Sequence, residues 1–371
     1  MNLHCITPRR WAVALSVAAL AACGGGGSDY TAPTSSTSGF VATSIVSDRG
    51  ATNNPYSSAN VDANLVNAWG IAFNPNGYVW VANAGTSTST LYDGNGVPQS
   101  LVVAIPAGTA GSASPTGIVF NGSTDFVVSQ AGKSGASPFV FVGEAGTLSG
   151  WSPSVALNTA VTVYDGAASG TVYKGLALAS SGGANFLYAT DFHNGRVDVF
   201  DASFAKVTVA GGFTDPTLPA GYAPFGIQAI GGSLYVTFAK QDTSAHDNVN
   251  GAGLGLVDVF DATGHFVKRL VDVGGALNAP WGLALAPANL GTFGNALLVA
   301  NFGDGKINAF NATTGALMGS LNKADGTPIA IDGLWGIAFG NGINSQPTNT
   351  LFFTGGPSDE AHGVYGRIDF H

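Results

Sequence analysis

The feature of this sequence that most constrains its fold is a short phrase that recurs six times. Each copy places a glycine third in a mostly apolar run of six residues. The glycines follow one another at spacings of 47, 58, 51, 56 and 54 residues. A phrase that returns at such intervals predicts repeated supersecondary units that pack side by side. The six copies are AWGIAF (68–73), PTGIVF (115–120), YKGLAL (173–178), PFGIQA (224–229), PWGLAL (280–285) and LWGIAF (334–339).

Each copy is followed by further runs that alternate in the manner of β-strands. A third run is clearest in RVDVFDAS (196–203), LVDVFDATG (256–264) and KINAFNATTG (306–315), and FVKRLVDV (266–273) is a fourth. Four short strands about every 50 residues are typical of the blades of a propeller. The sequence therefore predicts an all-β fold, a six-bladed β-propeller of four-stranded blades. The expected second strands are YVWVAN (78–83), DFVVSQ (125–130), FLYATD (186–191), SLYVTF (233–238), ALLVAN (296–301) and TLFFTG (350–355).

The two ends of the repeat region predict how the ring closes. The last copy has only three strands and ends at GRIDF (366–370), whereas FVATSIVSD (40–48) is a strand without a blade of its own. An unpaired strand edge is a liability in a folded protein. We therefore expect the N-terminal strand to complete the last blade.

Charge excludes one class of partner. The chain has 13 Lys and Arg residues against 22 Asp and Glu residues, and only 9% of its residues are charged. Nucleic-acid binding needs clustered basic side chains to neutralise phosphates. We therefore expect no nucleic-acid partner.

The N-terminus has the pattern of an export signal. Arg9 and Arg10 precede the apolar run WAVALSVAALAA, which is too short to span a bilayer. The run ends at Cys23, and LAAC resembles a bacterial lipobox, which implies acylation of Cys23. An ordinary signal peptide with an incidental Cys23 is the alternative. We expect a signal in residues 1–22, a flexible Gly/Ser/Thr tether in 23–39, and a propeller in 40–371.

The chain resembles NHL-type six-bladed propellers and, more closely, a family of uncharacterised exported bacterial propellers. The residues that carry the closer resemblance are NLVNAWGIA, NFGDGKINAF and GPSDEAHGVYG, together with AKQD, HD and GLVDVFD in the fourth repeat. The resemblance implies the fold but no reaction. Since the residue after Cys23 is glycine, similarity to other lipoproteins implies the outer membrane as its location.

Oxygen-bearing side chains end four of the six expected second strands. In gluconolactonase and paraoxonase-like propellers, which the chain resembles more distantly, oxygen ligands in a comparable region hold a Ca²⁺ that polarises a lactone carbonyl. The resemblance implies such a metal site, and amide and carboxylate oxygens are the ligands that Ca²⁺ prefers. The alternative is that each side chain only holds the turn that follows its strand. The candidate ligands are Asn83, Gln130, Asp191 and Asn301.

Two polar insertions are further candidates. Residues 239–253 of the fourth repeat carry Lys240 and Asp242, together with His246 and Asp247 as a base or metal ligand. Residues 356–363 of the sixth repeat carry Asp359, Glu360 and His362, which can bind a cation or orient the closing strand. For both insertions a purely structural role is the alternative. His193 and Asp304 occupy equivalent turns of the third and fifth repeats, which favours a turn role for both.

Large aromatic residues precede the repeated glycine in four copies. A ring of such side chains can stack a sugar or another planar ligand, and packing between blades is the alternative. The four residues are Trp69, Phe225, Trp281 and Trp335.

These patterns predict a lipid-anchored propeller of the cell envelope that acts as a binding or scaffold module. The alternative is a Ca²⁺-dependent lactonase or esterase. We expect a monomer that contacts the membrane through its anchor and binds an envelope protein or a small carbohydrate or lactone.

Overall fold

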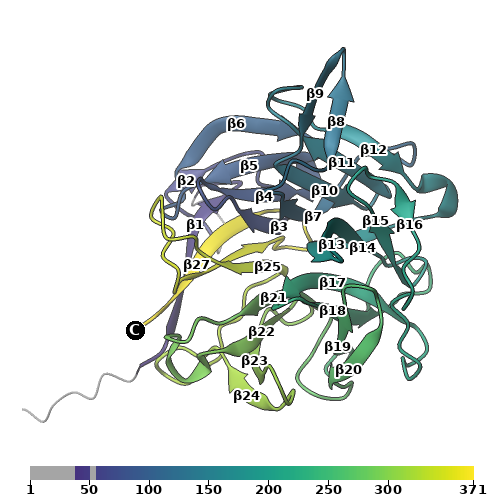
Figure 1. The fold of residues 1–371 in the computed structure, drawn as a ribbon. Coiled ribbons are helices and arrows are strands. Elements are labelled where there is room, and N and C mark those ends of the chain that lie inside the picture. Colours follow the sequence, from purple (N-terminus) through teal and green to yellow (C-terminus); the bar gives the residue numbers. More distant parts are fainter. Residues whose placement is uncertain (1–37, 51–55) are drawn as a thin grey trace, which may run out of the picture. The chain divides into compact units, whose positions relative to one another are not determined.

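The computed structural model describes residues 38–50 and 56–371, which belong to one compact unit, Thr37–His371. The signal in 1–22 and nearly all of the tether, including Cys23, lie outside the described residues. The unit is a six-bladed β-propeller whose inner strands lie near the centre of the ring in Figure 1, with the outer strands at its rim. This confirms the fold predicted from the repeats.

Blades one to three follow the chain from the inner strand outwards. Blade one contains β3 (Ala68–Phe73), β4 (Val79–Asn83), β5 (Thr88–Tyr92) and β6 (Pro98–Ala104). Blade two contains β7 (Pro115–Phe120), β10 (Phe139–Gly143), β11 (Thr147–Trp151) and β12 (Val161–Asp165). Blade three contains β13 (Tyr173–Ser181), β14 (Ala184–Asp191), β15 (Arg196–Phe200) and β16 (Lys206–Val207).

Blades four to six continue in the same order. Blade four contains β17 (Tyr222–Ile230), β18 (Ser233–Lys240), β19 (Gly255–Asp261) and β20 (Phe266–Val271). Blade five contains β21 (Pro280–Leu285), β22 (Ala296–Asn301), β23 (Ile307–Asn311) and β24 (Leu317–Ser320). Blade six contains β25 (Leu334–Phe339), β26 (Leu351–Gly355) and β27 (Val364–Phe370). Short 3₁₀ helices, η1 (Ala84–Thr86), η2 (Ala167–Ser169) and η3 (Gly291–Phe293), lie in connections.

The N-terminal strand completes the ring as predicted. Strand β1 (Phe40–Ser47) pairs antiparallel with β27 and is followed at the edge by β2 (Asn60–Val61), which pairs parallel with β1. Just beyond β1, Asp48 accepts a hydrogen bond from the His362 ring at 2.9 Å. The first and last segments of the propeller are thus joined by both backbone and side chains.

Blade two corrects one expectation. The run 125–130 is not its second strand, because β8 (Val127–Gln130) pairs only with β9 (Lys133–Ala136) in a separate two-stranded hairpin. The second strand is β10, whose Gly143 pairs with Pro115 of the inner strand. An inserted hairpin has the same alternating pattern as a blade strand, so periodicity alone could not distinguish them.

The six repeated glycines lie where adjacent inner strands approach most closely. A β-carbon on Gly70 would lie 2.3 Å from the carbonyl oxygen of Thr116 in the next blade, and one on Gly226 would lie 2.0 Å from that of Trp281. The other four glycines meet the neighbouring blade in the same way. Glycine therefore recurs because the backbones of the ring leave no room for a side chain.

The axis of the ring has two different ends. Where the inner strands end, residues of all six blades line a cavity of about 500 Å³, which we call the funnel. Beside the glycines the space narrows to about 30 Å³. Where the inner strands begin, aromatic side chains fill the axis. We call the polar surface around this second end the mouth, made of Asn67, Glu144, Lys174, His246, Asp247 and Glu360.

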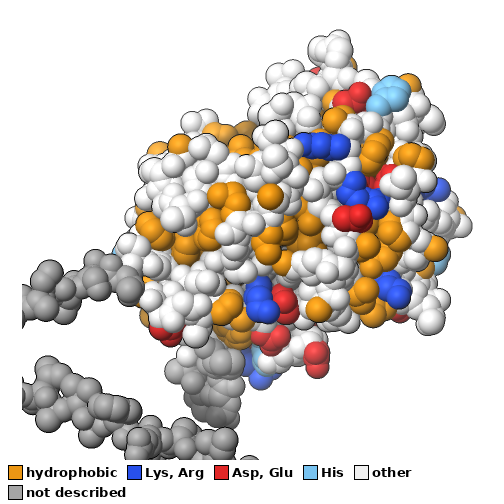
Figure 2. Space-filling model, turned by 90° about the horizontal axis from the view of Figure 1, so that it is seen from below, with side chains coloured by type: hydrophobic (Ala, Val, Ile, Leu, Met, Phe, Trp, Pro, Cys, Tyr) orange, Lys and Arg blue, Asp and Glu red, His pale blue; other side chains and the backbone are white. Residues whose placement is uncertain are grey.

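The outer surface carries few charges. Figure 2 shows hydrophobic side chains between scattered charged groups on the side of the molecule seen from below. Exposed apolar residues on outer strands include Val267 and Leu317. The part of the chain that the structure describes contains no helix with the length and hydropathy needed to span a bilayer.

Candidate functional site

A buried lysine is the centre of the mouth. Lys174 of β13 occupies the repeat position that holds an aromatic residue in four other blades, and its side chain is 1% exposed. Its ammonium group lies 5.2 Å from the ring centroid of Trp69, within the range of a cation–π contact. A buried ammonium group is stable only where charged or polar partners surround it.

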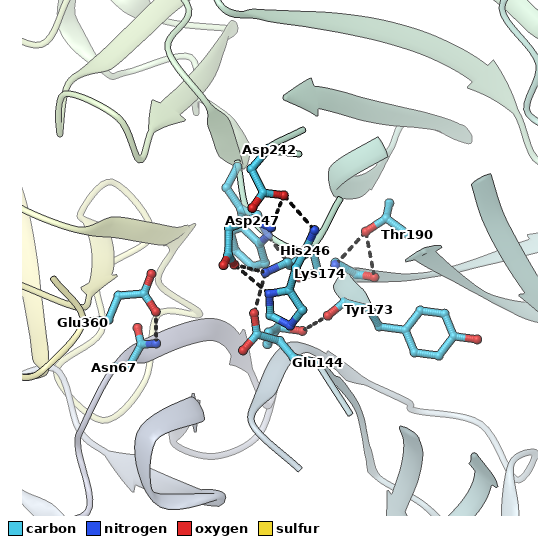
Figure 3. Close-up of polar contacts among 12 residues, drawn as sticks. Asn67, Glu144, Tyr173, Lys174, Thr190, Asp242, His246, Asp247 and Glu360 are labelled. Atoms are coloured by element: carbon cyan, nitrogen blue, oxygen red, sulfur yellow. Dashed lines mark hydrogen bonds and ion pairs between the residues drawn. The ribbon is translucent and has the colours of Figure 1, made fainter. Parts of the chain in front are cut away.

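Two carboxylates from neighbouring blades supply those partners. Lys174 Nζ donates to Glu144, in the turn between β10 and β11, and lies 3.3 Å from Asp247 of blade four. Burial alone would raise the pKa of Asp247, but the Lys174 ammonium and the hydrogen bond with His246 outweigh it and lower that pKa. Lys174 therefore holds three blades together at the axis, as Figure 3 shows.

The insertion of blade four folds over this ion pair. Asp242 accepts hydrogen bonds from the Ser244 hydroxyl at 2.7 Å and from the His246 backbone N–H at 3.0 Å, and these donors lower its pKa. The His246 ring lies 3.0 Å from Asp247. The structure thus brings Asp242, His246 and Asp247 together, as the sequence predicts, while Lys240 is exposed.

The insertion of blade six reaches the same end of the ring. Ser358, Asp359 and Glu360 all have φ between +53° and +65°, which is costly for residues with a β-carbon. Glu360 accepts a hydrogen bond from Asn67 at 2.6 Å. Burial raises the pKa of Glu360, and the charge of Glu144 raises it further, against the smaller opposing effects of Lys174 and Asn67. The insertions of blades four and six therefore both place charged side chains near Lys174 and Glu144.

The other two residues of that insertion do not join the site. His362 is bonded to Asp48 next to the closing strand, and Asp359 is exposed. The role of His362 fits the structural alternative that the sequence left open, since it fastens the two ends of the ring.

The four predicted aromatic residues form a packed cluster at the axis, beneath the mouth. Trp69 and Trp335 stack at 3.6 Å between ring centroids, and Phe302 stacks on the other side of Trp335 at 4.0 Å. Phe225 and Trp281 contact Trp335 edge-on. Of the four predicted residues only Trp281 is partly exposed, so packing between blades accounts for the other three.

Three of the four predicted oxygen ligands, Asn83, Asp191 and Asn301, are buried and hydrogen-bonded to different neighbours. Asn83 donates to Thr88 and Thr90 in its own blade, and Asn301 donates to the Ala276 carbonyl and to Asp304. The side-chain carbonyls of both asparagines lack a partner among the described residues.

Asp191 is also engaged within its own surroundings. It accepts from Thr171, from the Val172 backbone N–H and from Asn194, and it pairs with Arg196 at 3.1 Å. Gln130 lies in the exposed hairpin, so its predicted place at the end of the second strand of blade two is wrong, because that hairpin is not part of the blade.

One group of side chains has the spacing of a metal site. Ligand atoms of Glu144, His246 and Asp247 lie within 4.8 Å of one another. The Lys174 ammonium, however, already contacts both carboxylates. A divalent cation would have to displace a buried positive charge, which disfavours binding.

Sequence reasoning missed Lys174 and Glu144. A lysine where the repeat otherwise prefers an aromatic residue is a detectable signal, because it breaks the pattern at a buried position. Glu144 has no such signal, because the sequence pattern predicts the second strand of blade two at 125–130, whereas the strand that precedes Glu144 is β10.

Two relatives share most of the chain. Uncharacterized proteins of Acanthamoeba polyphaga mimivirus are 34% identical over 319 residues, covering 84% of this chain and 76% of the relative, and 33% identical over 317 residues, covering 84% and 82%. The chain belongs to the family of these mimivirus proteins. No family model matches it. The membership in an exported bacterial family stays a prediction.

One solved structure supports the fold, and the fold alone. A protein of unknown function from Bacteroides thetaiotaomicron has a TM-score of 0.54 at 10% identity, covering 90% of this chain and 76% of that one. Virginiamycin B lyase from Staphylococcus aureus has a TM-score of 0.49 at 13% identity, covering 89% and 99%. At such identities a shared fold does not transfer a reaction.

Proposed function

We propose that this propeller is a lipid-anchored binding module of the cell envelope and that the mouth is its contact surface. The observation that supports this most is the convergence of both polar insertions on Lys174. Loops that exceed the norm of their blades often carry function. Here two of them, from blades four and six, place charged groups around the same end of the axis.

The charges of the mouth favour a cationic ligand. Glu144, Asp247 and Glu360 face a single lysine, so negative charge is in excess. A nearby positive charge would stabilise ionised Glu360 in particular, because burial and the charge of Glu144 disfavour its ionised form and raise its pKa. A protonated amine beside Glu360 would favour the ionised carboxylate and so offset the effects of burial and of Glu144. We therefore propose a small amine, or the amine group of a larger envelope partner, as the bound chemistry.

The anchor is the second part of the proposal. The lipobox-like LAAC at Cys23 and the export pattern before it support acylation and attachment to the outer membrane. The described propeller begins its first strand at Phe40, so the tether of 23–39 joins the two.

A Ca²⁺-dependent lactonase or esterase is the second candidate. The close group of Glu144, His246 and Asp247 favours it, with His246 as a base. Asp191 is already held by Thr171, Asn194 and Arg196, which speaks against a metal site at the ends of the second strands, although the side-chain carbonyls of Asn83 and Asn301 lack a partner among the described residues. The contact of Lys174 with both carboxylates speaks against a metal at the mouth.

Thermal shift with spermidine and glucosamine tests the binding function. We expect both amines to raise the melting temperature, with about 2.7 kcal/mol of stabilisation at 100 times the dissociation constant. Glu360→Gln keeps an acceptor for Asn67 but removes the charge, so the shift should disappear. Asp325→Asn, at an exposed position away from the mouth, is the control and should keep it. A shift that survives Glu360→Gln, or no shift in the unmodified protein, would rule out amine binding here.

A further inference from the structure

The funnel is a second cavity, at the opposite end of the axis from the mouth. Its lining comes from the ends of all six inner strands and includes Phe73, Phe120, Leu178, Leu285 and Phe339. Gln228 is the one polar side chain among the lining residues. Its volume of about 500 Å³ lies in the range of small-molecule sites. All the lining side chains except Gln228 are apolar, while Gln228 and backbone groups supply the polar part of the surface, so the cavity suits a ligand with an apolar body and a polar end.

The base of the funnel is closed. Beyond the narrow space beside Gly70, Gly117, Gly282 and Gly336, the axis is filled by Trp69, Trp335 and their neighbours. A ligand can therefore enter from the wide end and be surrounded by six blades, without passing to the mouth. Such a blind apolar cavity suits a narrow, unbranched chain with its polar end left at the opening.

The chain outside the described residues indicates where that ligand comes from. Phe40, at the start of the propeller, packs on Phe293 at 6.0 Å between ring centroids, in the connection that follows Leu285 in blade five. Between the predicted acylation site Cys23 and Gly39 lie residues whose composition predicts a flexible tether. Such a tether spans on average about 20–25 Å and at full extension about 60 Å. The predicted anchor therefore keeps the funnel within reach of the membrane surface.

We propose that the funnel binds one acyl chain of a membrane lipid. The tether raises the local concentration of such lipids around the funnel, as it does for any linked binding site. Each methylene that moves from water into the funnel contributes about 0.8 kcal/mol, so a lipid chain that already lies outside the bilayer core is held even when it is only partly inserted. The proposal rests on the lipid anchor of the proposed function, but it does not depend on the binding of amines at the mouth.

Titration with cis-parinaric acid, a fluorescent fatty acid, tests the proposal on the full chain carrying Cys23→Ser, which removes the predicted acylation site. We expect saturable binding of about one probe per chain. Leu285→Asp places a charge on the funnel wall and should weaken binding by about tenfold or more. Leu317→Asp is the matched control, since Leu317 is also an exposed leucine, at 54% against 44% for Leu285, on the outer strand of the same blade, and it should bind like the parent. Ala338→Trp, which fills the funnel, should also abolish binding.

Three results would overturn the proposal. The first is no saturable binding of the probe. The second is binding that Leu285→Asp and Ala338→Trp leave unchanged. The third is binding by the Cys23→Ser chain but not by the acylated chain, which would show that the protein's own anchor fills the funnel. Glu360→Gln should not affect the probe, so a failure at the funnel is distinguishable from a failure at the mouth.

Discussion

Replacing Gly226 by alanine should destabilise the propeller by about 3 kcal/mol or more, at the upper end of what overpacking costs. The added β-carbon would lie 2.0 Å from the carbonyl oxygen of Trp281 and 2.9 Å from the Thr237 hydroxyl. The first of these atoms belongs to the backbone of the next blade, so it cannot move aside without shifting a whole inner strand. Thermal unfolding of Gly226→Ala against the parent chain measures the effect.

Gly275→Ala is the matched control for this prediction. A β-carbon at Gly275 would meet nothing closer than 3.9 Å, and its φ is not in the left-handed region. We expect its stability to change by less than about 0.5 kcal/mol. Similar melting temperatures for the two variants would contradict the explanation of the repeated glycine as a place of close contact between blades.

The second large effect concerns two buried acids, Asp258 of blade four and Asp215 in the connection that precedes this blade. Asp258 of β19 accepts a hydrogen bond from Arg269 of β20 at 3.1 Å, and Arg269 also pairs with Asp215. The pKa of Asp258 is raised to about 7, chiefly by burial. The nearby Asp215 adds to this rise, and Arg269 opposes it in part. One oxygen of Asp258 lacks a donor among the described residues, so protonation would let it donate towards Asp215.

Stability should therefore fall as the pH rises from about 4 to about 7. In that range the unfolded chain has already released the proton of Asp258, whereas the folded chain still holds it, so the folded state binds more protons. Above pH 7 the folded carboxylate is ionised and its contribution stays lost. Asp258→Asn imitates the protonated acid and removes this dependence, so it should be more stable than the parent at pH 8 by about 2–4 kcal/mol and similar to it at pH 4.

Asp272→Asn is the control for the acid pair. Asp272 contacts the same Arg269 at 3.2 Å but its side chain is 68% exposed, so its removal should leave the pH dependence in place. Denaturant unfolding from pH 4 to pH 9 measures all three proteins. Parallel curves for the parent and Asp258→Asn would contradict a proton held by Asp258 near neutral pH.

The fold was predictable because its determinants are local and repeated. Three of these determinants can be recognised in the sequence itself. They are the glycine of each inner strand, the alternating runs after it and the unpaired strand at 40–48. The hairpin of β8 and β9 was not predictable, because it imitates a blade strand. Because of that hairpin, the predicted position of Gln130 is wrong and Glu144 is not recognised as a site residue.

The mouth was predictable only in part, because its geometry depends on contacts between distant blades. The insertions that carry His246, Asp247 and Glu360 were visible as polar loops. Their convergence was not, since Asn67 and Glu360 are 293 positions apart in the chain. Trp69, Trp335 and Phe225 pack at the axis because the ring narrows there, which no single repeat can reveal.

The decisive measurement for the mouth is the metal content of the purified full chain, together with its melting temperatures in excess Ca²⁺ and in EDTA. Because Lys174 already holds Glu144 and Asp247, we expect no stoichiometric metal and a melting temperature that neither addition moves. About one Ca²⁺ per chain, with a melt that EDTA lowers and that Asp247→Asn makes insensitive to EDTA, would contradict this expectation and favour the hydrolase.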